Sequence, residues 1–363
     1  MWFRNFLNLL AGLRERNGFA VRWLTMFASL STPILFALGG LAGLIILATG
    51  YRMTGLSDQI ADRTGWGEAL VGAALLGAAT SMSGTVVSLT SALDGRASLA
   101  FSNGIGGIAA QTAFLALADM IYRRANLEHA AADLANVFQA GLLLLLLTVP
   151  LMAFTVPEVA YWGIHPASVA LFVLYAYGLR ATARLREEPM WHPVDTSETR
   201  TDAPEDDGEA EKPASALILP FLLLLVLMAL SGWSVARIAG ELSDRLELSD
   251  TVVGATMTAV LTSLPELVTT LVAVRRGALQ LAVGGIIGGN TFDTLFLTLS
   301  DVGYRDGSLY HAITADDLFW LTVAMMMTAV LTLGLIFRQR HGIGWESIGL
   351  LVIYAGALAV QIL

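Results

Sequence analysis

Two parts of this 363-residue chain carry the same sequence pattern in one fixed register. Each residue of the second copy lies 182 positions after its counterpart, so Thr80-Ser81 falls on Thr262-Ser263 and Asp119 falls on Asp301. The register continues through Val71-Gly72-Ala73 and Val253-Gly254-Ala255, Ile105-Gly106-Gly107 and Ile287-Gly288-Gly289, and Phe114-Leu115 and Phe296-Leu297. Apolar composition alone would not align hydroxyls, paired glycines and an aspartate, so the pattern indicates an internal duplication.

The composition indicates where the duplicated chain folds. Hydrophobic residues make up 55% of the chain and charged residues only 14%, which is too little polar surface for a soluble globular protein. There is no cysteine, which excludes disulfides and thiolate chemistry, and the five histidines lie singly, which argues against a zinc site. No phosphate-binding G-x-x-x-x-G-K-[ST] loop is present. We therefore expect an integral membrane protein that is not an enzyme and is not driven by ATP.

Ten apolar segments are long enough to cross a bilayer. The first five lie at about Leu30–Thr49, Ala69–Ala92, Leu99–Ile121, Ala131–Thr148 and Val156–Ala181. The second five lie at about Ser215–Ala239, Thr251–Val274, Leu279–Leu299, Ala315–Phe337 and Trp345–Leu363. Before them, a short apolar run flanked by Arg4, Arg14 and Arg16 predicts an amphipathic helix on the membrane surface.

The number of spans sets the relative direction of the two copies. Corresponding spans lie five apart, an odd number, so the copies must cross the membrane in opposite directions. We therefore predict an all-α membrane protein whose ten transmembrane helices form two inverted five-helix repeats. Inverted repeats with helix-breaking residues at matching places are common in secondary transporters, whose sites lie near the bilayer midplane where the repeats meet.

An acidic stretch that contains several prolines, Leu185–Pro213, separates the two sets of spans. Its composition predicts a disordered, solvated linker, which holds much of the excess charge behind the net −9 of the chain. We divide the chain into residues 1–182 (surface helix and first repeat), 183–214 (linker) and 215–363 (second repeat).

The distribution of basic residues predicts the orientation. Arginines are more frequent on the side that carries the linker, for example Arg123-Arg124, Arg275-Arg276 and Arg338. The positive-inside rule therefore places the linker in the cytoplasm and both termini outside, although the arginines near the N-terminus favour the opposite orientation. We expect a multi-pass protein of the cell or inner membrane.

A carboxylate and a proline lie inside an apolar span of the second copy, in the stretch Gly254–Glu266. A charge at the centre of a membrane helix costs roughly 2.5–3.5 kcal/mol, so Glu266 is a candidate functional residue. Pro265 frees the carbonyl oxygen of Leu261 beside Thr262, and these oxygens are ligands for hard cations. The alternative is a simple proline kink with a glutamate that pairs with an arginine or reaches the interface.

The next span carries a second polar turn. Glycines at i and i+4, Gly284 with Gly288 and Gly285 with Gly289, allow close helix packing. Packing explains the glycines, but it does not explain Asn290 and Asp293 in the following turn. In the first copy their counterparts are Ile108 and Gln111.

These residues carry a family resemblance. Thr-Ser-Leu-Pro-Glu and Gly-Gly-Asn-x-x-Asp, on adjacent helices of a duplicated ten-span chain with an acidic central loop, resemble the alpha-repeats of the cation/calcium antiporter superfamily, which includes the sodium/calcium exchangers. The resemblance implies that carboxylates, amides, hydroxyls and backbone carbonyls bind sodium and calcium alternately. Matched residue by residue, it implicates Glu266, Asp293, Thr262, Ser263, Asn290, Thr80, Ser81 and Gln111. It implies membrane lipid and inorganic cations as partners, no cofactor and no nucleic acid, and it leaves the oligomeric state open.

The first repeat departs from the family pattern at one carboxylate. Ser83 stands where the proline is expected and Gly84 where the glutamate is expected. Calcium usually takes six to eight oxygens, and the two remaining carboxylates still match one divalent ion. We therefore expect an antiporter of calcium or another divalent cation against sodium or protons. The alternatives are a monovalent sodium or potassium/proton antiporter and a membrane sensor or scaffold that transports nothing; Thr80, Ser81 and Gln111 argue against the last.

Overall fold

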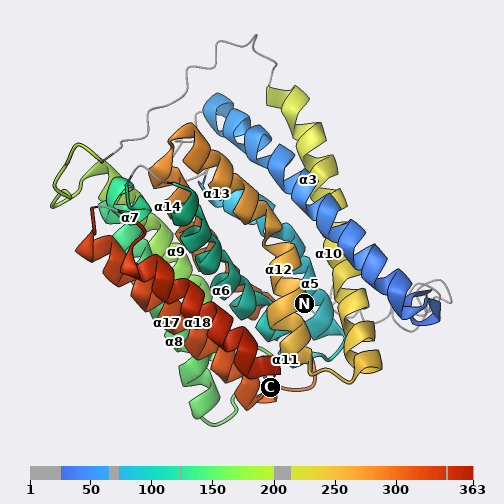
Figure 1. The fold of residues 1–363 in the computed structure, drawn as a ribbon. Coiled ribbons are helices and arrows are strands. Elements are labelled where there is room, and N and C mark those ends of the chain that lie inside the picture. Colours follow the sequence, from blue (N-terminus) through green and yellow to red (C-terminus); the bar gives the residue numbers. More distant parts are fainter. Residues whose placement is uncertain (1–25, 65–72, 123–124, 200–213, 341, 363) are drawn as a thin grey trace.

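The computed structural model describes residues 26–64, 73–122, 125–199, 214–340 and 342–362, and these residues are helical without a β-sheet (Figure 1). The predicted N-terminal surface helix lies outside the described residues. The helices of the first repeat are α3 (Thr32–Thr64), α4 (Ala73–Thr80), α5 (Met82–Leu93), α6 (Ala97–Ile121), α7 (Leu127–Ala130), α8 (Leu134–Thr155) and α9 (Pro166–Glu187), preceded by the short η1 (Phe27–Ser29).

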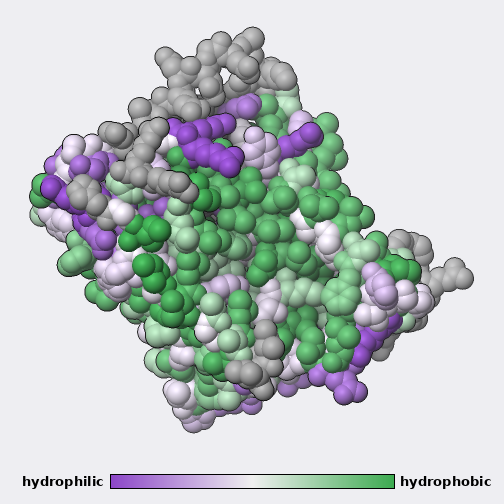
Figure 2. Space-filling view, viewed as in Figure 1, coloured by the Kyte–Doolittle hydropathy of each residue, from purple (hydrophilic) through white to green (hydrophobic). Residues whose placement is uncertain are grey.

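The second repeat contains the corresponding helices. They are α10 (Ala214–Leu246), α11 (Asp250–Val252), the π-helical η3 (Val253–Thr258), α12 (Ala259–Thr262), α13 (Leu264–Arg276), α14 (Leu279–Asp293), α15 (Leu295–Gly303), α16 (Leu309–Ala312), α17 (Ala315–Phe337) and α18 (Trp345–Ile362). Counting α4/α5, α11–α13 and α14/α15 as one broken span each gives the ten predicted spans. Figure 2 shows a broad apolar surface, with hydrophilic residues gathered towards the helix ends.

Hydrogen bonds at the helix ends show that the repeats are inverted. Ser98, at the start of α6, donates to Asp317 at the start of α17 (2.6 Å). Gln280, at the start of the corresponding α14, donates to the carbonyl of Ala132, just before α8 (3.1 Å). Since α8 follows the end of α6 after a short connection, α6 and α14 begin at opposite ends of the bundle.

The second span of each repeat breaks at the same position. Helix α4 gives way to α5 at Ser81, and α12 gives way to α13 at Ser263, with closely similar backbone angles (φ −79°, ψ 3° and φ −93°, ψ 2°). Pro265 lies in the first turn of α13, where a proline is well tolerated. The first copy has Ser83 at the equivalent position and breaks nonetheless, so the proline is not required for the break.

The first span of each repeat packs on the broken span of the other repeat. Gly50 of α3 lies directly against Pro265, where a Cβ atom would clash with the proline ring. Its counterpart, Gly232 of α10, lies directly against the backbone of Ser83, the counterpart of Pro265. Helices α3 and α10 also lie side by side (Figure 1). This cross-packing brings both breaks to the centre of the molecule.

Each repeat contains a loop that is held by hydrogen bonds to a buried aspartate, and we call this loop and its aspartate the capped loop, or cap, of the repeat. Asp119 accepts hydrogen bonds from the backbone N–H of Leu127 and from Ser347, both at 2.8 Å. Asp301 accepts them from the backbone N–H of Leu309 (3.1 Å) and from Ser168 (2.7 Å). Leu127 and Leu309 are 182 residues apart, like the two aspartates. The contacts therefore follow the register of the duplication.

Two predictions from the sequence need correction. The fifth span was expected from Val156, but α9 begins at Pro166, because α8 continues to Thr155 and the ring of His165 accepts a hydrogen bond from the backbone of Ala167 as an N-cap. The linker was expected to be disordered from Leu185, but α9 continues to Glu187.

The chain after α9 is also held by defined contacts. His129 lies 2.8 Å from the hydroxyl of Thr196, and Arg338 donates to the carbonyl of Val194 (2.9 Å). Residues 194–199 thus dock on the loop side of α7 and α17 and do not form a free tether.

Candidate cation site

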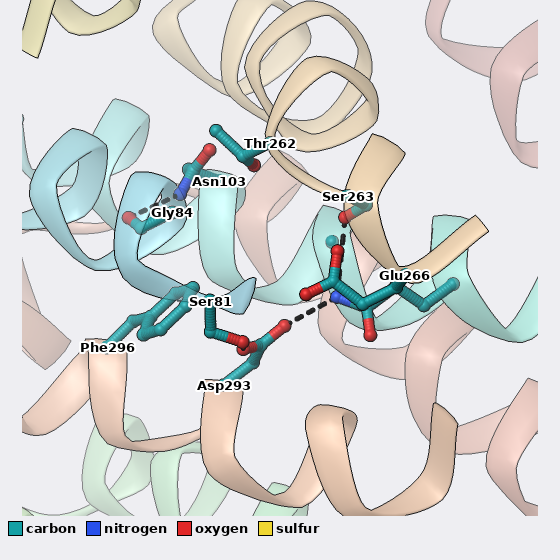
Figure 3. A pocket seen from close by; sticks show the side chains of 10 residues that line it. Ser81, Gly84, Asn103, Thr262, Ser263, Glu266, Asp293 and Phe296 are labelled. Atoms are coloured by element: carbon teal, nitrogen blue, oxygen red, sulfur yellow. Dashed lines mark hydrogen bonds between the residues drawn. The ribbon is translucent and has the colours of Figure 1, made fainter. Parts of the chain in front are cut away.

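A small pocket lies where the two broken spans meet (Figure 3). Helices α5 and α6 of the first repeat and α12 to α15 of the second contribute to it. Its lining residues are Ser81, Gly84, Asn103, Gly107, Gln111, Thr262, Ser263, Glu266, Asp293 and Phe296. The structure therefore brings six of the eight residues predicted from the sequence into one pocket.

The carboxylate of Asp293 is held by donors from the opposite repeat. Its Oδ1 accepts a hydrogen bond from Ser81 (2.7 Å), and its Oδ2 accepts one from the Gln111 side-chain amide (2.7 Å) (Figure 3). The Asp293 side chain is buried. Such bonds to a charged acceptor are stronger than neutral ones and fix the orientation of the carboxylate.

Gln111 shows how the pocket departs from internal symmetry. Its amide nitrogen also donates to Ser263 Oγ (3.3 Å), which is the symmetry counterpart of the bond between Ser81 and Asp293. In the second repeat this position is a carboxylate that only accepts. In the first repeat it is an amide that donates to both neighbours.

Glu266 is the carboxylate of the pocket that lacks hydrogen-bond donors of ordinary geometry. It is buried in the first turn of α13, and neither carboxylate oxygen accepts a hydrogen bond of ordinary geometry, although the Thr80 hydroxyl is close enough to interact. Asp293 faces it across the pocket (Figure 3). The positive end of the α13 dipole offsets part of its charge.

No arginine neutralises Glu266 within the described part of the chain. The ion pairs found there involve Arg96, Arg237 and Arg245, which pair with acidic residues near the ends of the helices. The alternative was a proline kink with a glutamate that pairs with an arginine or reaches the interface, and the pairing is wrong for the described residues.

The hydroxyls of the second repeat offer oxygen atoms to the pocket. Thr262 donates its own proton to the carbonyl of Thr258 (2.9 Å), so only its oxygen lone pairs are left for a ligand. Ser263 accepts from Gln111 at the break itself. Both are buried, and both lie within one turn of Glu266.

Two predicted residues flank the pocket and do not line it. Asn290 donates to the hydroxyl of Thr112 (3.0 Å), which ties α14 to α6. The hydroxyl of Thr80 donates to the carbonyl of Gly77 (3.3 Å) and lies beside Glu266.

Three lining residues were not identified from the sequence. Asn103 donates to the carbonyl of Gly84 (3.1 Å) and to Ser88 (2.9 Å), but its repeat counterpart is Gly285, so the duplication gave no signal. A Cβ atom built on Gly107 would lie 3.5 Å from Ser263 Oγ and 3.9 Å from Asp293 Oδ2, so this glycine borders the polar groups of the pocket. Phe296 appeared in the repeat register only as an apolar position.

The pocket is suited to small hard cations or protons. Its donor atoms are carboxylate, hydroxyl and amide oxygens, which are the ligands of sodium, calcium and magnesium. Among the described residues there is no group of three or more acidic, histidine or cysteine side chains that could hold a metal ion. Any cation bound here therefore relies on two carboxylates and neutral oxygens.

Comparison with known proteins places these features in a family. The family profile described as "Sodium/calcium exchanger protein" matches residues 33–180 and 216–363. The sodium/calcium exchanger MaX1 of Methanosarcina acetivorans is 35% identical over 119 residues, which cover 32% of this chain and 33% of that protein. The inner membrane protein YrbG of Escherichia coli is 26% identical over 259 residues, covering 70% of this chain and 75% of that protein.

The arrangement of the helices matches a solved structure over almost the whole chain. The sodium-calcium exchanger NCX_Mj superposes with a TM-score of 0.60 and 21% sequence identity, covering 91% of this chain and 99% of that one. This likeness confirms the predicted fold, in which ten spans form two inverted repeats. Together with the family match, it confirms that the chain is a multi-pass membrane protein.

Proposed function

Because this chain belongs to the sodium/calcium exchanger protein family, we propose that it exchanges calcium or another divalent cation for sodium or protons across the membrane. One observation carries the proposal: Glu266 and Asp293 are buried carboxylates that face one pocket, and no basic side chain of the described residues pairs with either. Two buried negative charges in a bilayer need compensation, and bound cations or protons supply it.

The inverted repeat accounts for exchange at a single site. The pocket lies between two copies of one structure that cross the membrane in opposite directions, so rocking one part against the other exposes it to either side in turn. Cations that need the same two carboxylates compete for the pocket. Loading by one species on one side and release of another on the other side then gives antiport.

A monovalent cation/proton antiporter is the second candidate, because the first repeat has lost negative charge. Gly84 occupies the position in the first repeat that corresponds to Glu266 in the second. Gln111 contributes a hydrogen-bond donor at the position that corresponds to Asp293. Fewer anions reduce the electrostatic advantage of a divalent ion over a monovalent ion.

Transport by purified protein in liposomes tests the proposal. Calcium uptake is followed with labelled calcium, and proton movement with a pH-sensitive dye, under imposed sodium, potassium and proton gradients. Calcium uptake that requires an opposing sodium or proton gradient supports the proposal. Proton exchange with sodium or potassium but without calcium flux supports the monovalent candidate. The absence of calcium and proton transport in every assay supports a sensor or scaffold.

The cellular arrangement is part of the proposal. We place the protein in the cell or inner membrane, with residues 188–199 and the following linker on the cytoplasmic side, because basic residues are more frequent there. Cysteine labelling from each side at His192, which is exposed, would report the orientation.

A further inference from the structure

The place of the missing carboxylate is occupied by an aromatic ring. Gly84 is the counterpart of Glu266, and a Cβ atom built on Gly84 would lie 2.7 Å from Phe296 Cε2 and 3.0 Å from Cζ. Real Cβ atoms do not approach other carbons so closely. No side chain fits at position 84 while the ring stays where it is.

Phe296 is held against the first repeat by its surroundings. Its side chain is 3% exposed, its ring packs edge-to-face on Phe292 with centroids 6.3 Å apart, and its Cβ lies 3.4 Å from a Cβ built on Gly104. Two glycines of the first repeat thus provide the space that the ring fills. Figure 3 shows the ring on the Gly84 side of the pocket, away from Glu266.

The phenylalanine lies just after the break between α14 and α15. Phe296 follows that break, which lies at Thr294, by two residues. Its counterpart, Phe114, lies in α6, which is continuous through the equivalent position. Phe114 is not among the residues that line the pocket. The asymmetry is therefore built into the backbone as well as the side chains.

We propose that Phe296 is a specificity-determining residue that fixes the pocket at two negative charges, so that each half-cycle carries two positive charges and exchange is electroneutral. This inference rests on the proposed cation antiport. The ring offers no oxygen ligand and fills the Gly84 side of the pocket, so a cation lies towards Glu266, Asp293, Thr262 and Ser263. One divalent ion or two monovalent ions or protons balance the two carboxylates.

The contact itself is tested by a double-mutant cycle on stability. Gly84→Ala should lower the melting temperature of the detergent-purified protein by several degrees, because its methyl group meets the Phe296 ring. The same substitution in a Phe296→Ala background should cost little, because the space is then free. Phe114→Ala is the matched control, and it should not relieve the effect. Equal effects of Gly84→Ala in all three backgrounds would overturn the contact.

The charge is tested by adding the missing carboxylate together with space for it. The variant carrying both Gly84→Glu and Phe296→Ala should bind calcium roughly tenfold more tightly than Phe296→Ala alone, measured by calorimetric titration with calcium chloride. On a solid-supported membrane, the parent should give no sustained exchange current. In the double variant, three monovalent ions balance the three carboxylates whereas one calcium ion brings only two charges, so exchange of the two should give a sustained current. Unchanged calcium affinity in the folded double variant, or a sustained current in the parent, would overturn the inference.

The two proposals can fail separately. If the parent exchanges cations but the double variant neither binds calcium more tightly nor generates current, the role of Phe296 is wrong and antiport stands. If the parent exchanges nothing while the double variant binds calcium more tightly, the filling of the site by Phe296 stands and the proposed antiport is wrong.

Discussion

The two repeats keep the same backbone at the pocket and place different chemistry on it. Both break at a serine, Ser81 or Ser263, and both of these serines engage the opposite repeat. The second repeat supplies both carboxylates, whereas the first supplies a glycine and an amide at the same positions. The hydroxyls and the helix breaks are thus common to both repeats, whereas the number of carboxylates differs between them.

The capped loops at opposite ends of the bundle also differ in buried charge, but here the first repeat holds more acid. The first-repeat cap holds Glu128 where the second holds Tyr310, and it adds Glu346, which accepts a hydrogen bond from Asn126 (2.6 Å). Tyr310 is hydrogen-bonded to Ser168 (2.9 Å), but neither carboxylate oxygen of Glu128 has a partner of ordinary geometry. The Tyr310 hydroxyl is thus paired, whereas the first-repeat cap carries an excess of buried acid.

The largest expected effect removes the charge that distinguishes the second repeat. Glu266→Gln keeps the shape of the side chain but removes a carboxylate that no basic side chain of the described residues neutralises. We expect cation exchange in liposomes to fall to background while the protein stays folded, because loss of an uncompensated membrane charge does not destabilise the fold. Exchange at the parent's rate by the glutamine variant would exclude Glu266 from transport.

A smaller effect should separate the two serines. Ser81→Ala removes a hydrogen bond to the charged Asp293, and such bonds contribute about 1.5–3 kcal/mol. Ser263→Ala removes only a longer bond from a neutral amide. We expect the exchange rate to fall roughly tenfold or more for Ser81→Ala and clearly less for Ser263→Ala. The reverse order would show that Asp293 does not depend on its first-repeat donors.

The acidic cap predicts a pH dependence of stability. Burial raises the pKa of the Glu128 carboxyl well above its usual range, and the nearby Asp119 and Glu346 raise it further. A group whose pKa is higher in the folded than in the unfolded protein stabilises the fold at low pH, and this contribution is lost as the pH rises. The basic groups beside this cap are His129 and Arg338, which contact each other's backbone.

Glu128→Gln should therefore raise the melting temperature by several degrees at pH 8 and change it little at pH 5. Thermal unfolding of the purified protein between these values measures the effect. Tyr310→Phe, at the equivalent position of the other cap, is the matched control and should leave the pH dependence as it is. A variant that follows the parent's pH profile would show that Glu128 keeps no proton in the folded protein.

The smallest expected effect concerns the docked start of the linker. Thr196→Val removes the contact with the His129 ring and should loosen residues 194–199. We expect faster limited proteolysis of this segment, with cation exchange unchanged, because the pocket lies in the middle of the bundle. His192→Ala, a change at an exposed position just before this segment, should leave the proteolysis rate at the parent's value.

The sequence was sufficient for the features that depend on local chemistry. The spans could be recognised because crossing a bilayer requires a long apolar helix, and α17 has the bounds expected for it. The candidate ligands could be recognised because a carboxylate such as Glu266 is costly in an apolar span. The misplaced start of α9 arose because an apolar stretch before Pro166 forms a loop, which hydrophobicity alone does not distinguish from a helix.

The sequence by itself determined the duplication, the inverted direction of the repeats and the identity of the charged residues, because each depends on spacing or on the cost of charge in lipid. Only the tertiary structure decided which partners meet. Ser81 and Asp293 are 212 residues apart, and Gly84 and Phe296 are equally distant in the chain. Such contacts depend on how α3 and α10 pack against the two broken spans. The distances between side chains on packed helices are set by the tertiary structure and not by a local sequence pattern.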